Sequence, residues 1–299
     1  MSELSDQIRL LRDDAGQVRL DREVVLATGD AVVDYLQGQL SQDVAALEPG
    51  RGAWTFVLEP QGKVDAWFRV TRLDDTTFVL DIDSGWADHL VARLERFRLN
   101  TPVSFERVDW QVTAVRGAEA PTPSTPPDPE RGVVVPVEWP GEVGWDLIGD
   151  GGADLGLPEC GGGAAEALRI EAGRPCMGHE LDDSTIPNET GMVPISVSFT
   201  KGCYTGQELV ARIDSRGNRT PRRLVGLHLD SGAAPSAGTH LLVGDDQVGT
   251  ITSVASQSSL GHPVALAYLS RKVETPAEVL ADGLRARAVD LPLVEGPRA

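Results

Sequence analysis

Residues 201–213, KGCYTGQELVARI, hold the densest group of side chains that could do chemistry. Thr205 and Glu208 have the spacing of a capping box, in which each side chain bonds the other residue's backbone N–H. A helix is therefore predicted to begin here, with Cys203 just before its positive end and Lys201 two residues away. Both features favour a thiolate, so Cys203 is predicted to be reactive or ligand-binding; the alternative is an inert, packed thiol.

The segment after this motif is strongly basic. Five arginines and only one acid, Asp214, lie between residues 212 and 223, in a chain with 27 basic and 45 acidic residues and a net charge of −18. Arginine binds carboxylates and phosphates through two parallel N–H groups, so this segment could hold an anionic ligand. A solvated loop paired with the protein's own acids is the alternative. The arginines are Arg212, Arg216, Arg219, Arg222 and Arg223.

A predicted strand at 63–70, KVDAWFRV, places polar residues on one face. Alternation puts Lys63, Asp65, Trp67 and Arg69 opposite the apolar residues. This face could form the floor of a polar pocket for a flat heterocycle, or it could be the solvent side of a sheet.

Two further candidates lie between residues 168 and 189, LRIEAGRPCMGHELDDSTIPNE. Glu171 is near the end of a predicted helix and could direct its carboxylate at a ligand, although a surface glutamate has the same pattern. His179 lacks the partners of a catalytic triad and a second metal ligand at suitable spacing, so it is interpreted as structural.

Composition narrows the function. A pI near 4.6 argues against an extended nucleic-acid surface, because phosphate binding depends on clustered Lys and Arg. The three cysteines, Cys160, Cys176 and Cys203, form neither a disulfide framework nor a zinc-site spacing, so no metal site is predicted. The N-terminus has no signal-peptide layout, and no apolar stretch reaches the ~18 residues that cross a bilayer. We expect a cytoplasmic protein that is not membrane-spanning.

The elements that must position these residues can be read from the periodicity. Helices are predicted over 30–40 and 84–98, capped by Asp30 and Ser84, and over 164–172. The proline-rich segment 118–130 has no periodicity and is predicted to be a flexible surface excursion. From about residue 222, short strands between turns predict an antiparallel barrel of about 75 residues. Strands are predicted at 21–28, 53–58, 63–70, 76–83, 131–140, 143–149, 223–229, 239–243, 247–256, 263–270 and 284–294.

The string KGCYTGQE, preceded by the 168–189 segment and followed by VARI, strongly resembles the YgfZ family of folate-binding proteins. That family belongs to the superfamily of the glycine cleavage T-protein, a tetrahydrofolate-dependent aminomethyltransferase. The resemblance extends to DYLQGQLSQDV and EPQGKVDAW near the N-terminus, and to RRLVGLHL, VGTITSVA, VALAYLS and DLPLV near the C-terminus. It covers most of the chain.

The resemblance implies an α+β fold. Two interleaved α/β lobes of the aminomethyltransferase folate-binding type and a C-terminal antiparallel β-barrel are expected around a central channel. The implied domains are a folate-binding domain at 1–220, which includes the excursion at 118–130, and a barrel domain at 221–299.

The resemblance also implies function. We expect a tetrahydrofolate-binding accessory protein that supports iron–sulfur cluster assembly or repair in cluster-dependent enzymes, including tRNA-modifying ones. Iron–sulfur enzymes or assembly proteins are the implied partners, and direct nucleic-acid binding is not expected. The alternative is one-carbon transfer by an aminomethyltransferase-like enzyme. Two departures weaken that alternative: Ala66 replaces the second acid of the transferase's pair, and Met177 replaces its tyrosine.

Site residues carry over by position. Cys203 matches the signature cysteine, Lys201 its neighbouring lysine, and Glu171 the glutamate that holds the pterin. Asp65 falls near the transferase's catalytic aspartate. The candidate catalytic residues are Cys203, Lys201 and Asp65. The candidate cofactor-binding residues are Glu171, Arg169, Asp65, Trp67, Tyr204, Arg212 and Arg223.

Overall fold

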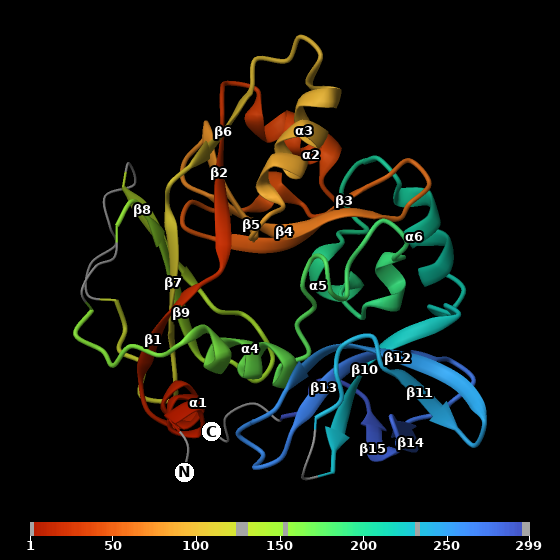
Figure 1. Cartoon of the computed structure of the whole chain (residues 1–299). Helices are drawn as coiled ribbons and strands as arrows, with labels where there is room; N and C mark the ends of the chain where they lie inside the picture. The colour runs from red at the N-terminus through yellow and green to blue at the C-terminus, as the bar shows by residue number, and fades with distance from the viewer. Residues whose placement is uncertain (1–2, 124–130, 152–154, 231–233, 295–299) are drawn as a thin grey trace.

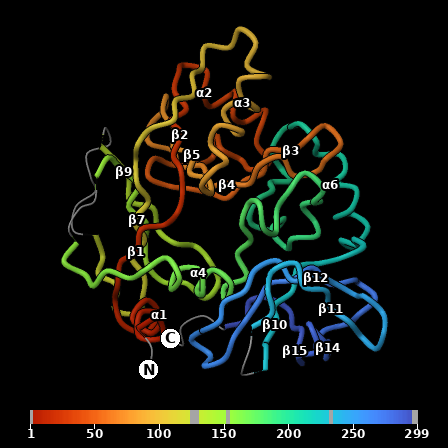
Figure 2. The backbone as a smooth tube through the Cα atoms, in the orientation of Figure 1, coloured from red at the N-terminus to blue at the C-terminus, as the bar shows by residue number. Residues whose placement is uncertain are grey.

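The computed structural model describes residues 3–123, 131–151, 155–230 and 234–294. Two β-sheets with their helices and a closed β-barrel are grouped around a central region (Figure 1). The backbone trace shows how the chain leaves the first sheet, returns to the second and ends at the barrel (Figure 2).

The first sheet is antiparallel and five-stranded. Its strands are β2 (Arg22–Thr28), β3 (Gly52–Leu58), β4 (Val64–Arg72), β5 (Thr77–Asp83) and β6 (Ser104–Val108). Their order is β3-β4-β5-β2-β6, and the pairing of β3 with β4 and of β4 with β5 confirms the predicted meander. The helices α2 (Val32–Gln39) and α3 (Ala87–Arg98) bury Leu36, Leu90 and Leu94 in the same apolar cluster as Phe68. Burial of this cluster supplies the main driving force for folding of the lobe.

The second sheet has four antiparallel strands. They are β1 (Gly16–Leu20), β7 (Gln111–Arg116), β8 (Gly132–Pro136) and β9 (Gly144–Gly149), in the order β1-β7-β9-β8. Val24 and Val79 of the first sheet cluster with Val112 and Ile148 of the second, which joins the two sheets. The first strand of the second sheet precedes the whole first sheet in sequence, so the two lobes are interleaved as expected.

Two helices pack together at the second sheet. α1 (Glu3–Asp13), which was not predicted from the sequence, contacts α4 (Gly162–Glu171). Ile8 and Leu11 of α1 are buried with Ala164 and Leu168 of α4 and with Leu266 of the barrel. The N-terminal helix, α4 and the barrel thereby share one apolar core.

The C-terminal part is a closed six-stranded barrel, which confirms the predicted antiparallel barrel. Its interior holds small and branched side chains such as Val225, Ile251 and Ala267. The short strand β14, which has one charged residue, Glu278, among four apolar ones, was missed by sequence analysis. In the order in which they pair, the strands are β10 (Arg222–Leu229), β13 (Val264–Ser270), β12 (Asp246–Ala255), β11 (His240–Val243), β14 (Ala277–Ala281) and β15 (Leu284–Val289).

The N-caps predicted for the helices that correspond to α2 and α3 were wrong. The residues at the N-caps of α2 and α3 are Ala31 and Trp86, not Asp30 and Ser84, and neither makes a side-chain cap. At α3 a residue distant in sequence takes over, because Glu23 accepts hydrogen bonds from the backbone N–H groups of Gly85 (3.0 Å) and Ala87 (2.9 Å). A tertiary contact has replaced the local one.

The predicted capping box at Thr205 and Glu208 does not form either. The helix α6 (Gln207–Asp214) begins later, and Gly206 at its N-cap has a φ of 79°. A Cβ on Gly206 would lie 2.5 Å from the carbonyl oxygen of Glu59, so glycine is required by both conformation and close approach. The helix start packs on the β3–β4 turn.

Residues 124–130 of the proline-rich segment lie outside the described residues. The segment's beginning is held in place, since Trp145 Nε1 donates to the carbonyl oxygen of Pro121 (2.7 Å). Within the described ranges, no helix is long and apolar enough to span a membrane.

Candidate functional site

A cavity of about 430 Å³ lies where the two sheets and α4 meet. We call it the central cavity. It is lined by charged side chains from six separate segments, with Trp54 of β3 as its large aromatic residue. The charged lining residues are Arg19, Asp21, Arg22, Arg69, Asp83, Asp146, Glu166, Arg169 and Arg174, and His179 also lines the cavity.

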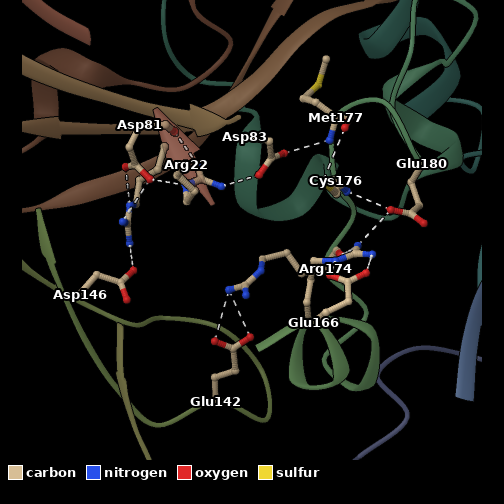
Figure 3. A network of polar contacts seen from close by, with 12 residues as sticks. Arg22, Asp81, Asp83, Glu142, Asp146, Glu166, Arg174, Cys176, Met177 and Glu180 are labelled. Atoms are coloured by element: carbon tan, nitrogen blue, oxygen red, sulfur yellow. Dashed lines mark hydrogen bonds and ion pairs between the residues drawn. The ribbon is translucent and has the colours of Figure 1, made fainter. Parts of the chain in front are cut away.

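Arginine–carboxylate pairs line one side of the cavity (Figure 3). Arg22 donates to Asp81 (2.6 Å) and Asp83 (2.8 Å). Arg69 donates to Asp81 (2.9 Å) and to Asp146 (2.6 Å). Each guanidinium thus bridges two carboxylates, which fixes the donors and acceptors before any ligand binds.

Electrostatics keep these groups charged. Burial alone would raise the pKa of Asp146, but the guanidinium groups of Arg116 and Arg69 hold it well below its usual range. Burial likewise opposes the charge of Arg22, and its carboxylate partners outweigh that effect and raise its pKa. The cavity wall therefore carries fixed positive and negative charges in nearly equal number.

The opposite wall connects α4 to the barrel. Arg169 donates to Glu166 (2.7 Å), Glu180 (3.0 Å) and Ser253 of β12 (2.7 Å). Glu180 also accepts from the backbone N–H of Cys176 (3.0 Å) and from the Ser253 hydroxyl (2.6 Å). Arg169 lines the central cavity and also links α4 to the 174–180 segment and to the barrel.

The aromatic residue at the cavity is Trp54 rather than the predicted Trp67. Trp67 is buried, donates to Ser196 Oγ (3.0 Å) and stacks behind Trp54, with ring centroids 4.2 Å apart. Arg22 lies over the outer Trp54 ring at 5.2 Å. Sequence alternation in β4 could not find Trp54, which is on the neighbouring strand.

Asp65 does not share a face with Trp67 and Arg69, as alternation predicted. The β3–β4 register shifts at this point, so Val57 pairs with Ala66 but Leu58 with Val64, and Asp65 is the extra residue of a bulge. Its carboxylate contacts α3, with one oxygen 2.6 Å from His89 Nε2 and the other 2.8 Å from Arg93 Nε. Asp65 does not line the central cavity.

Glu171 does not line this cavity either. The side chain is completely buried, and both carboxylate oxygens accept from Ser259, at the backbone N–H (2.6 Å) and at the hydroxyl (2.7 Å). Arg12 lies 3.7 Å away. In this structure Glu171 anchors the β12–β13 loop to the end of α4.

The cysteine motif lies on another part of the molecule. Lys201 donates to the carbonyl oxygens of Gln37, Leu40 and Gln42, and thereby caps the C-terminal end of α2. Burial lowers the pKa of Lys201 to about 8. Cys203 is exposed and Tyr204 is buried; neither lines the central cavity.

The five arginines between residues 212 and 223, which were predicted to hold an anionic ligand, are dispersed in the structure. Arg212 is exposed on α6, and Arg222 pairs with Glu189 (3.0 Å) and lies over the Tyr268 ring. Arg223 donates to the barrel turn at Thr275 (3.1 Å). The five arginines of this segment do not converge on the central cavity, because strand β10 draws the last two into the barrel wall.

Arg69 and Arg169 were named from the sequence, but three other cations that line the cavity, Arg19, Arg22 and Arg174, were missed because they come from different elements. The one local signal was Arg174, which directly follows the glycine that ends α4. Within the described ranges, no group of three or more His, Cys, Asp or Glu residues is arranged to hold a metal ion.

Comparison with known proteins identifies the family. Residues 222–297 match the glycine cleavage T-protein C-terminal barrel domain. An aminomethyltransferase of Streptomyces avermitilis is 27% identical over 84% of this chain and 77% of its own length. An uncharacterized protein of Haemophilus influenzae is 30% identical over 65% of this chain and 67% of its own length.

A solved structure confirms the fold. The crystal structure of the glycine cleavage system aminomethyltransferase T from Bartonella henselae superposes with a TM-score of 0.82 at 21% identity, over 98% of this chain and 90% of that one. The interleaved lobes and the closed barrel are thus those of the T-protein fold. The barrel match, the relatives that align with most of the chain and the shared fold agree. The chain belongs to the glycine cleavage T-protein (aminomethyltransferase) superfamily.

Proposed function

We propose that this protein binds a reduced folate, with the pterin ring in the central cavity. The observation that carries the proposal is the cavity itself, in which Trp54 and a fixed arginine–carboxylate network line about 430 Å³. This volume lies in the range that holds small organic ligands. A pterin is a flat ring with donors and acceptors on its edge, so it suits one aromatic face and a rim of preset polar groups.

Tetrahydrofolate is the expected cofactor because the chain belongs to a folate-dependent superfamily. Among the residues predicted from sequence, Arg169 lines the cavity and can contact the ligand directly. Glu171 and Asp65 are held by neighbouring protein groups, so we propose that they act on the ligand only if it displaces those partners.

The finer proposal is an accessory role in iron–sulfur cluster assembly or repair. It is supported by the KGCYTGQE string and by the exposure of Cys203. It is also supported by Met177, which lines the cavity where the transferase motif has tyrosine. Cluster-dependent enzymes, including tRNA-modifying ones, are the proposed clients.

Calorimetry with tetrahydrofolate tests the binding proposal. Trp54→Ala removes the stacking surface and is expected to weaken binding at least about fivefold, since aromatic contacts contribute on the order of 1 kcal/mol beyond their buried area. The matched control is Trp110→Ala, at a tryptophan outside the cavity lining, with an expected change of less than twofold. Absence of binding by the unaltered protein would reject the proposal.

The client proposal needs a test in cells. In a strain that lacks its own family member, the unaltered gene is expected to restore the activity of a cluster-dependent tRNA-modifying enzyme, and Cys203→Ala is expected not to. If both genes restored the enzyme activity equally, Cys203 would not be required for the role. If neither restored it, the proposed iron–sulfur role would be rejected.

One-carbon transfer is the second candidate, because relatives that match most of the chain are named aminomethyltransferase. Asp65 would be the residue that orients or activates the folate nitrogen. Turnover in an aminomethyl-lipoyl carrier assay that is lost in Asp65→Asn would support this candidate, and no turnover would reject it.

A further inference from the structure

A second cavity of about 260 Å³ lies beside the central cavity. We call it the side cavity. Trp54, Arg69, Asp146 and Arg174 line both cavities, so these residues form the partition between them. Trp139 closes the side cavity with a second aromatic face. A ligand that extends from the central cavity toward the side cavity would contact these residues.

Arg174 differs from the other buried arginines around the cavities. Arg22, Arg69, Arg116 and Arg169 each pair with two carboxylates. Among the described residues, Arg174 pairs with Glu142 alone, and Glu142 is shared with Arg116. It is the arginine with the least charge compensation in this network.

The geometry of that pair leaves part of the guanidinium group available. Both contacts to Glu142 are made through Nη1, at 3.1 and 3.2 Å (Figure 3). Across the described ranges, Nε and Nη2 of Arg174 have no protein acceptor. Nε and Nη2 form the side edge of the guanidinium, whose two parallel N–H groups match the two oxygens of a carboxylate.

We propose that Arg174 is the anion-binding residue of this site and that a carboxylate of the ligand binds its Nε–Nη2 edge at the partition between the two cavities. The stacking of Arg174 near the Trp139 ring, 5.7 Å from the ring centroid, holds the guanidinium plane in place for this contact. That the ligand is a folate rests on the proposed function, whereas the binding of a carboxylate does not.

Protonation equilibria agree with this assignment. Burial lowers the pKa of Arg174, and the single carboxylate Glu142 does not offset it. At Arg22 and Arg116 burial is outweighed by two carboxylates, and the pKa is raised. A carboxylate bound to Arg174 would supply the missing second partner.

The carboxylate has two sources, the glutamyl tail of a folate or a separate small carboxylate, and calorimetry with four probes separates them. Tetrahydrofolate carries ring and tail, 4-aminobenzoyl-L-glutamate only the tail, 6-methyltetrahydropterin only the ring, and acetate only a carboxylate. Arg174→Gln removes the charge, Arg174→Lys keeps the charge but not the paired N–H edge, and Arg96→Gln on the surface of α3 is the matched control.

If the tail binds Arg174, Arg174→Gln weakens tetrahydrofolate and 4-aminobenzoyl-L-glutamate about ten- to a hundredfold, as expected for charge-assisted hydrogen bonds, and changes 6-methyltetrahydropterin less than twofold. If a separate carboxylate binds there, acetate binding alone is lost. In either case, the affinity of Arg174→Lys for the affected probes is expected to lie between those of the unaltered protein and Arg174→Gln. Arg174→Lys keeps the ion pair with Glu142 and so guards against misfolding.

Binding of all four probes by Arg174→Gln as by the unaltered protein would overturn the proposal. Failure of tetrahydrofolate to bind the unaltered protein, with Arg174-dependent binding of a carboxylate probe, would reject the folate function and leave the role of Arg174 standing. Failure of every probe to bind would reject both.

Discussion

Glu180 is the residue whose replacement tests most sharply how the barrel is joined to the lobes. Its carboxylate is completely buried and accepts from Arg169 (3.0 Å), from Cys176 N (3.0 Å) and from Ser253 Oγ (2.6 Å). Glu180→Gln keeps the shape of the side chain but removes the charge and one acceptor. Loss of one partner of a buried ion pair costs about 3–5 kcal/mol, and the retained amide oxygen favours the lower end, about 3 kcal/mol.

The chain offers a matched control for this prediction. Glu166 binds the same Arg169 at a shorter distance, 2.7 Å, but its side chain is 44% exposed. Water can replace the lost contact there, so Glu166→Gln is expected to cost at most about 1 kcal/mol. Distance alone would predict the opposite order, which makes the comparison informative.

The assay is equilibrium unfolding in urea without ligand, combined with hydrogen exchange of β12, which carries Ser253. Glu180→Gln is expected to lower the free energy of unfolding by about three times as much as Glu166→Gln and to increase exchange in β12. Equal losses in the two variants, or unchanged exchange in β12, would refute the claim that Glu180 holds the barrel in place.

Three further predictions concern other sites. Alkylation at neutral pH is expected to be faster at exposed Cys203 than at Cys160 and Cys176, because burial raises the pKa of the latter two; mass spectrometry of labelled peptides measures this, and equal rates would contradict it. The pKa of Asp146 is lowered in the folded protein, so the stability that it contributes is present above its unfolded pKa near 4 and is lost as the pH falls through the folded value. The difference in free energy of unfolding between the unaltered protein and Asp146→Asn should therefore shrink below pH 4, and a constant difference from pH 7 to pH 3 would contradict it. Lys201→Met is expected to lower the thermal midpoint by removing the cap of α2, while tetrahydrofolate affinity changes less than twofold; a large loss of affinity would place Lys201 in the site.

Local patterns predicted those elements whose residues face a core. The meander of β3 to β5 and the amphipathic helices α2 and α3 follow from apolar periodicity, and the barrel follows from short strands between turns. The caps failed where a distant residue supplied the contact, as Glu23 does at α3. A capping box uses side chains close in sequence to the helix start. In this protein, contacts with residues distant in sequence determined how the helix starts are held.

The site was less predictable because it is assembled across elements. Arg22 and Asp81 lie on paired strands and Asp146 lies on the other sheet, and no spacing in the sequence signals that they meet. A single bulge moved Asp65 off the predicted polar face. Glu171 has the motif expected of a ligand-facing residue, yet Ser259 of the barrel occupies both of its oxygens.

A crystal structure of the protein grown with tetrahydrofolate would show directly whether the folate binds in the central cavity. We expect the pterin ring against Trp54 in the central cavity, next to the Arg22, Arg69 and Arg169 side chains. A folate bound instead in the pocket beside Arg222 and Tyr268, or at the exposed Arg212 of α6, would contradict this expectation.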